Sequence, residues 1–190
     1  MYRKKMYKEC CKGCKLSKRI EKPRRGKLIV ELDGNWILNH YGGEEGFLGW
    51  MILQPKYHRM ELTDLYADEA AAVGRNIQQI DEALRAYWQR NFRDDCIERV
   101  YIVYFFESVF DDPQTKWHLH IHLIPRTVKL GKGKYGKGKP SENAAWGTVQ
   151  LTSKWWFPEE YRIWDKEGKE MEEEKVRALM KDLKSKLKAK

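Results

Sequence analysis

The chain has 190 residues, of which 42% are hydrophobic and 13% aromatic. This length suits one domain, with or without appended terminal segments, and the apolar content argues against global disorder. No apolar run approaches the roughly 20 residues of a membrane-spanning helix, and the charged first five residues lack the apolar core of a secretory signal. We therefore expect a cytoplasmic protein without a membrane partner.

The formal net charge of +9 is distributed unevenly. Residues 1–27 contain twelve Lys or Arg and only two Glu, whereas the two signs nearly balance over the rest of the chain. Residues 126–139 add six basic side chains and no acidic one. Such runs are common in solvated segments. They also raise the local concentration of phosphate-bearing ligands, such as nucleotides, RNA or DNA.

The first half of the chain begins with extended segments separated by turns. Residues 27–32 and 36–39 are typical of strands, and the Asp-Gly-Asn sequence at 33–35 predicts a hairpin turn between them. After a glycine-containing loop, the apolar run 47–53 suits a buried strand that stops at Pro55.

A long helix is predicted next, because apolar residues recur at alternating four- and three-residue steps. They are Val73, Ile77, Ile80, Leu84 and Tyr87. Asp68 and Glu69 would lie in its first turn, where carboxylates interact favourably with the helix dipole. A second helix is predicted at the end of the sequence, where Val176, Met180, Leu183 and Leu187 recur at helical spacing.

Between these helices, residues 100–106 and 117–124 read as two strands of an antiparallel hairpin. The expected fold class is α+β, with an antiparallel sheet, a long helix packed on it and a C-terminal extension that ends in a helix. We expect the following organisation: a basic segment with a cysteine cluster at 1–27, a central domain at 28–127, a mobile Gly/Lys-rich loop at 128–145, and a Trp-rich extension with a helix at 146–190.

Three of the five histidines lie within five residues, at His118, His120 and His122. The side-chain period of a strand is two, so all three imidazoles are expected on one face, with the alternating apolar residues on the other. Such a row could provide a nucleophile, a proton shuttle or a metal site. Hydrogen-bonded histidines on a half-buried face are the structural alternative.

The segment 114–126, Gln-Thr-Lys-Trp-His-Leu-His-Ile-His-Leu-Ile-Pro-Arg, resembles the signature of the histidine-triad nucleotide hydrolases and transferases. The order of the upstream parts is similar to that family over about residues 10–127. Many relatives have Gly-His after the glycine loop, whereas this chain has Gly46-Phe47. That difference concerns the shape of the pocket rather than the chemistry.

The resemblance implies roles for individual residues. His120 would attack the α-phosphorus of a nucleotide, a reaction for which imidazole is a good nucleophile near neutral pH. His122 would orient the site or the phosphate, so that His118, His120 and His122 form the expected catalytic set. Gln114 and Thr115 would contact phosphate oxygens, or else only shape the preceding turn. Asn39 would contact the ribose and phosphate, or else serve as a loop residue.

The cysteines suggest a metal site, because a disulfide framework is not expected in the cytoplasm. Cys11 and Cys14 form a Cys-x-x-Cys pair, which is weak evidence for zinc by itself. The resemblance implies structural zinc held by Cys11, Cys14, His58 and His118, although Cys10 could replace Cys11. Inert free thiols are the alternative. A zinc-bound His118 could not also protonate a leaving group.

We therefore expect a nucleotide hydrolase or nucleotidyl transferase that cleaves nucleoside polyphosphates through a covalent intermediate on His120. The resemblance favours an adenine nucleotide as substrate and a homodimer as the assembly. The alternative is a module that binds nucleotides or nucleic acid through the basic N-terminus and the Lys/Gly loop, with repair of nucleotide-capped ends as a combined function.

Overall fold

The computed structural model describes residues 11–18, 28–41, 47–104, 118–128 and 173–188. Within these ranges the elements are α1 (Lys12–Ser17), β1 (Val30–Leu32), β2 (Trp36–His40), β3 (Met51–Pro55), a short 3-10 helix (Leu62–Asp64), α2 (Ala67–Asn91), β4 (Ile97–Tyr104), β5 (Ile121–Thr127) and α5 (Glu173–Lys188). None of the described helices combines the length and apolar character needed to cross a membrane.

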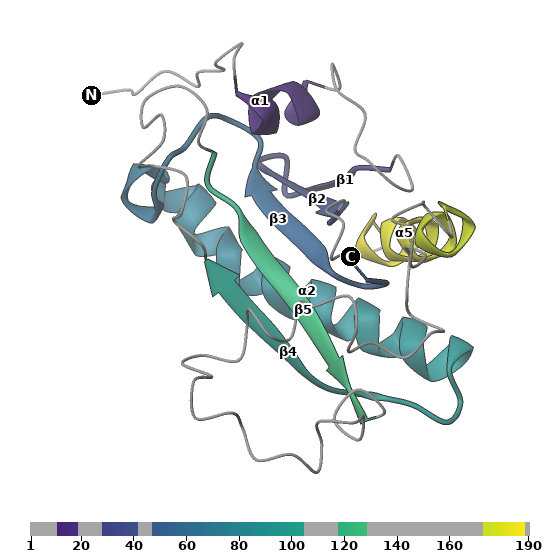
Figure 1. Ribbon diagram of the computed structural model, residues 1–190. Helices are drawn as coiled ribbons and strands as arrows, with labels where there is room; N and C mark the ends of the chain where they lie inside the picture. The colour runs from purple at the N-terminus through teal and green to yellow at the C-terminus, as the bar shows by residue number, and fades with distance from the viewer. Residues whose placement is uncertain (1–10, 19–27, 42–46, 105–117, 129–172, 189–190) are drawn as a thin grey trace, which may run out of the picture.

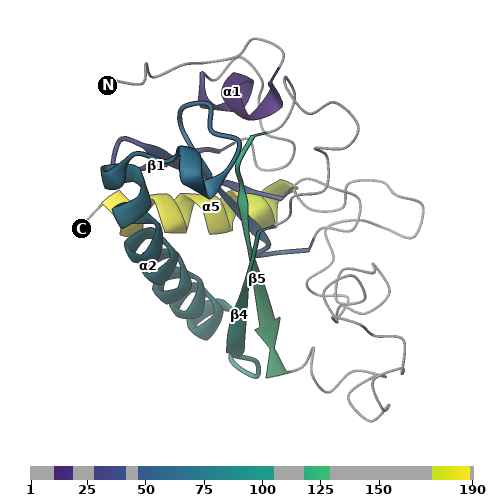
Figure 2. The same cartoon turned by 90° about the vertical axis from the view of Figure 1, so that its left-hand side faces the viewer.

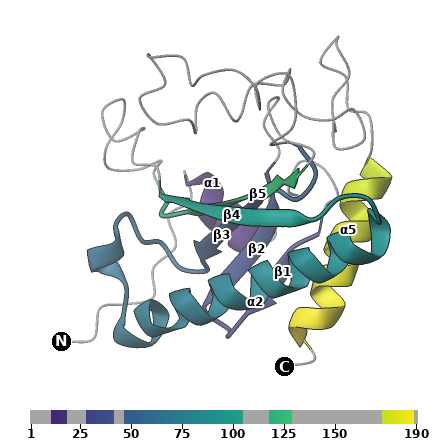
Figure 3. The ribbon, with the colours of Figure 1, turned by 90° about the horizontal axis from the view of Figure 1, so that it is seen from below.

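The strands form one antiparallel sheet in the order β1-β2-β3-β5-β4. The helices α2 and α5 lie on the same side of this sheet (Figures 1 and 2), and Figure 3 shows α2 running along it. The helix α1 lies at the end of the sheet where β3 ends and β5 begins (Figure 1). The expected α+β class with an antiparallel sheet is confirmed.

The main core lies between the sheet and the two helices. Leu38 of β2 is paired with Leu53 of β3, which is paired in turn with Ile121 of β5, so these side chains share one face of the sheet. They pack with Ile80 and Leu84 of α2, and all five side chains are buried. The long predicted helix and its apolar face are therefore confirmed.

The C-terminal helix α5 belongs to this same core. Its side chains Val176, Leu179, Met180 and Leu183 are fully buried and pack with residues of α2, β1 and β2. Their i, i+3, i+4, i+7 spacing forms one apolar stripe. Burial of each such side chain contributes on the order of 1.5–3 kcal/mol. The helix therefore contributes substantially to the stability of the fold.

The predicted hairpin between the first two strands is present. Leu32 and Trp36 are directly paired, and the chain reverses through Asp33 and Gly34, both of which have positive φ angles of 49° and 68°. Aspartate tolerates this left-handed region better than most residues, and glycine adopts it freely. The turn chemistry read from the sequence therefore sets the register of β1 and β2.

The strand predicted over residues 47–53 begins later than expected, at Met51. Residues 47–50 instead form a turn in which the backbone N–H of Trp50 donates to the carbonyl of Phe47 at 3.1 Å. Gly49 has φ +90° in this turn, and a Cβ there would lie 2.7 Å from the ring of Trp88. The close approach of α2 thus requires glycine, and its backbone angle interrupts the apolar run.

Candidate functional site

Four potential metal ligands come together at the end of the sheet. Cys14 lies in α1 and Cys11 is the N-cap residue of this helix, His58 follows β3, and His118 precedes β5. All four are buried, and their donor atoms lie within 4.8 Å of one another. The Sγ of Cys11 is 3.3 Å from Nδ1 of His118, and the Sγ of Cys14 is 3.4 Å from Nδ1 of His58 and 3.6 Å from Nδ1 of His118.

The geometry of this Cys₂His₂ cluster fits zinc. Zinc–sulfur and zinc–nitrogen bonds of usual length, at tetrahedral angles, place sulfur and nitrogen ligands about 3.6 Å apart. Nε2 of His118 lies 2.8 Å from the carbonyl oxygen of Pro55, to which it can only donate, so Nδ1 presents its lone pair to the cluster. Hydrogen bonding with Cys14, supported by the two imidazoles, lowers the pKa of the Cys11 thiol well below its usual value although burial opposes it.

Gly13 allows the α1 helix to approach His118. A Cβ on this residue would lie 2.3 Å from Cγ of His118, a distance that requires the ring or the helix to move. Its carbonyl accepts hydrogen bonds from Nε2 of Gln54 and Oγ of Ser17, both at 3.0 Å. The glycine within the Cys-x-x-Cys segment is therefore a packing requirement of the cluster, which sequence reasoning did not identify.

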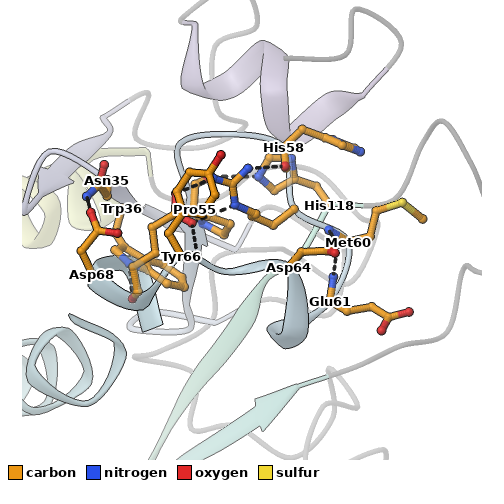
Figure 4. A network of polar contacts seen from close by, with 12 residues as sticks. Asn35, Trp36, Pro55, His58, Met60, Glu61, Asp64, Tyr66, Asp68 and His118 are labelled. Carbon is orange, nitrogen blue, oxygen red and sulfur yellow. Dashed lines mark hydrogen bonds and ion pairs between the residues drawn. The ribbon is translucent and has the colours of Figure 1, made fainter. Parts of the chain in front are cut away.

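A buried ion pair supports the segment that carries His58. The guanidinium of Arg59 binds both carboxylate oxygens of Glu69 at 2.8 and 2.9 Å and also donates to the carbonyl of His58 at 2.9 Å. Glu69 in addition accepts from the backbone N–H of Tyr66, at the start of α2. The backbone carbonyl of Arg59 accepts from the N–H of Leu119 at 2.7 Å. Figure 4 shows Tyr66 of this network together with His58 and His118 within a larger set of polar contacts.

Replacing Arg59 with methionine should lower the free energy of unfolding by about 3–5 kcal/mol, because Glu69 would remain buried without its partner. Urea denaturation measures this change. Arg75→Met is the matched control, since its ion pair with Asp33 is exposed and should contribute about 1 kcal/mol or less. Equal losses in the two variants would contradict the assigned role of the Arg59–Glu69 pair.

The middle histidine of the triad is held by the backbone of the first. Nδ1 of His120 lies 2.8 Å from the carbonyl oxygen of His118. A carbonyl can only accept a hydrogen bond, so Nδ1 carries the proton and the lone pair of the neutral ring is on Nε2. This is the tautomer in which Nε2 can act as a nucleophile. His120 is partly buried, between the cluster at His118 and the ring of His122.

The third histidine is buried and makes a side-chain hydrogen bond. The indole Nε1–H of Trp50 donates to Nδ1 of His122 at 2.9 Å, and the ring centroids of His120 and His122 lie 4.9 Å apart. Burial, together with the neighbouring charge of His120, lowers the pKa of His122 to about 3. His122 is therefore neutral near physiological pH. Sequence reasoning missed Trp50, and no spacing rule links it to the triad.

Asn39 lies in the same cross-strand row as His122. It is paired with Ile52, which is paired with His122, so the three side chains share the sheet face opposite the main core. Neighbouring strands lie about 4.8 Å apart, which places Asn39 roughly 10 Å from His122. Its side chain is buried, and its Nδ2 has no hydrogen-bond partner within the described structure. A buried amide of this kind is suited to donate to a ligand.

Three other candidate site residues lie outside the described residues. They are Cys10, Gln114 and Thr115. Their expected roles, as an alternative metal ligand and as phosphate contacts, stay predictions. The described part of the chain places the Cys₂His₂ cluster, His120, His122 and Asn39 on the sheet and at its end, although these residues come from positions far apart in the sequence.

The fold has counterparts among solved structures. A hypothetical histidine triad nucleotide-binding protein from Sulfolobus tokodaii strain 7 has a TM-score of 0.56 and 15% identity, over 94% of this chain and 93% of its own. A zinc-bound histidine triad family protein from Mycobacterium smegmatis has a TM-score of 0.50 and 16% identity, over 94% of both chains. No family model and no curated protein matches the chain.

These likenesses establish the fold class. The chain has the histidine-triad fold, and residues 118–122 carry the alternating histidines after which that fold is named. The buried Cys₂His₂ cluster is compatible with zinc.

Proposed function

We propose that the protein is a nucleotide hydrolase or nucleotidyl transferase that works through a covalent intermediate on His120. Nε2 of His120 would attack the α-phosphorus of a nucleoside polyphosphate, forming an N–P bond. The bond from phosphorus to the bridging oxygen would break, and its electron pair would leave with the departing phosphate. Water or a second acceptor would then attack phosphorus and return the N–P electron pair to Nε2.

The observation that carries this proposal is the hydrogen bond between Nδ1 of His120 and the carbonyl of His118. It keeps the proton on Nδ1, so the ring does not have to change tautomer before it attacks. The position of the ring is also fixed, because His118 is held by its contacts with the cluster and with Pro55. A nucleophile that is already fixed in this way lowers the activation free energy, because less orientational freedom is lost on the way to the transition state.

The metal cluster would hold His118, whose backbone carbonyl orients the ring of His120. We propose that Cys11, Cys14, His58 and His118 hold one structural zinc ion, which would stabilise the end of the sheet when bound. With Nδ1 committed to the metal and Nε2 donating to Pro55, His118 would have no nitrogen left for proton transfer to a leaving group. His118 would therefore position His120 rather than react itself.

A nucleotide is the substrate that best fits the surroundings. The buried amide of Asn39 lies on the same sheet face as His122 and would donate to the ribose or the phosphate. The fold is shared with a protein described as nucleotide-binding, which supports this substrate class. The resemblance of the triad segment favours an adenine nucleotide, and Gln114 and Thr115 would add phosphate contacts.

The test is intact-protein mass spectrometry after incubation with a panel of nucleoside and dinucleoside polyphosphates. We expect a mass increase of one nucleoside monophosphate after a rapid quench, and peptide mapping should locate it on His120. The same samples should contain the cleaved nucleotide. Absence of both adduct and turnover with every member of the panel would exclude the proposed activity. A salt-dependent shift of RNA or DNA in that case would favour the nucleic-acid-binding alternative.

A further inference from the structure

The triad contains two neighbouring imidazoles whose hydrogen bonds require opposite tautomers. His120 donates from Nδ1 to a carbonyl, whereas His122 accepts at Nδ1 from the indole of Trp50. An indole N–H can only donate, so Nδ1 of His122 carries the lone pair and Nε2 carries the proton. His120 thus offers a lone pair at Nε2, and His122 offers a proton at its own Nε2.

The indole that imposes this tautomer is itself firmly held. Trp50 is 3% exposed and stacks on Tyr41, with ring centroids 4.2 Å apart and planes at 20°. Phe47 packs against it at 5.7 Å, and Ile124 belongs to the same buried cluster. The backbone N–H of Tyr41 also donates to the carbonyl of Trp50 at 2.8 Å. The donor therefore has little freedom to turn away from His122.

We propose that Trp50 is a positioning residue that keeps His122 as a neutral Nε2–H donor, and that this donor binds a phosphoryl oxygen of the nucleotide while His120 attacks. Only the hydrogen bond from His122 to the nucleotide rests on the proposed function. The tautomer itself is a property of the protein without any nucleotide. No proton is transferred in this step, because His122 only donates a hydrogen bond.

A neutral donor in this position has a chemical consequence. Burial lowers the pKa of His122, so a positive charge on this ring is disfavoured. The neutral ring still carries its proton on Nε2, so it can donate a hydrogen bond to an oxygen that gains negative charge in the transition state. The hydrogen bond from Trp50 is needed for this role, because the other tautomer would turn the Nε2 lone pair toward the phosphoryl oxygen.

The first test uses the full chain without nucleotide. In ¹⁵N-labelled protein, imidazole nitrogen shifts should identify His122 as protonated on Nε2 and His120 as protonated on Nδ1. A scalar coupling between Nε1 of Trp50 and Nδ1 of His122, transmitted across the hydrogen bond, would establish the contact directly. Protonation of His122 on Nδ1 would overturn the proposal, whatever the protein does to nucleotides.

The second test compares Trp50→Phe with Trp36→Phe. Both substitutions remove a buried indole N–H, but that of Trp36 donates to the backbone carbonyl of Glu69 at 3.1 Å, on the helix side of the sheet. In Trp50→Phe we expect a mixture of His122 tautomers and a fall of about tenfold in the single-turnover rate of adduct formation, with nucleotide affinity changed by less than about twofold. Trp36→Phe should retain the wild-type His122 tautomer and rate.

The two levels of the proposal can fail separately. If wild-type protein shows the expected tautomers and coupling but forms no adduct with any nucleotide, the proposed function fails while the tautomer assignment stands. If adduct forms normally in Trp50→Phe, with the rate and the His122 signals unchanged, the positioning role is wrong while the proposed function stands. If Trp50→Phe does not fold, the measurements on wild-type protein decide the tautomer.

Discussion

Replacing His120 with glutamine should lower the rate of nucleotide cleavage by about a thousandfold or more and should abolish the covalent adduct. Glutamine can still donate to the carbonyl of His118, so the local hydrogen bond is retained. Its amide nitrogen has no available lone pair, however, and cannot bond to phosphorus. Single-turnover quench experiments with the nucleotide cleaved fastest by wild-type protein measure both quantities.

His40→Gln is the matched control for this experiment. His40 is equally part of the sheet, but its ring accepts from the backbone N–H of Gly49 and contacts the carbonyl of Tyr41, which indicates a structural role. At a temperature where the His40→Gln protein is folded, it should still form the covalent adduct on His120. Undiminished turnover in folded His120→Gln protein would show that the nucleophile lies elsewhere.

Replacing Cys14 with serine should remove bound zinc and lower the free energy of unfolding by about 5 kcal/mol or more. The Sγ of Cys14 lies within 3.6 Å of Nδ1 of both His58 and His118, so its loss removes the ligand that contacts both imidazoles. Structural zinc contributes its binding energy to folding. Elemental analysis should give one zinc per wild-type chain and none in the variant, and denaturation with and without a chelator measures the stability.

Cys96→Ser provides the control, because Cys96 is exposed and lies outside the cluster. It should keep one zinc per chain and wild-type stability. The zinc assignment would be wrong if wild-type protein bound no zinc after growth in zinc-supplemented medium. It would also be wrong if the two serine variants were equally stable. Loss of the metal should in addition slow adduct formation, because the carbonyl that orients His120 belongs to His118.

Local sequence patterns were sufficient to predict most of the elements. The hairpin at Asp33 and Gly34 follows from turn chemistry, and the α2 helix follows from its apolar spacing. The pairing of β4 with β5 agrees with two consecutive strand-like runs. These features depend on residues close together in the chain, so a short window contains the information that determines them.

The late start of β3 could not be predicted in this way. Residues 47–53 read as one apolar strand, but the backbone at Gly49 must make room for Trp88, which lies almost forty residues later in the sequence. That contact exists only once α2 has packed on the sheet. The same reason explains why the ion pair between Arg59 and Glu69 was not predicted: each is a type of residue usually found at the surface, and only the fold buries them together.

The cysteines and histidines of the candidate site could be predicted from the sequence, but the residues that hold them in place could not. The Cys-x-x-Cys pair suggested Cys11 and Cys14, and the resemblance to the histidine-triad family implied His58 and His118 as their partners. The structure brings these four side chains together. The contacts that set their tautomers were not visible in the sequence. One of these contacts is the carbonyl of Pro55, a backbone atom that every residue type possesses.

The position of α5 in the core affects the order in which the protein can fold during synthesis. Its buried stripe at residues 176–183 packs on α2 and β1, which leave the ribosome many residues earlier. Until this helix emerges, the nascent sheet exposes part of its apolar face and is open to non-native association. Completion of the domain therefore requires α5 to meet α2 and β1, which lie far away in the sequence. Such long-range contacts slow folding, so we expect the chain to become resistant to proteolysis late.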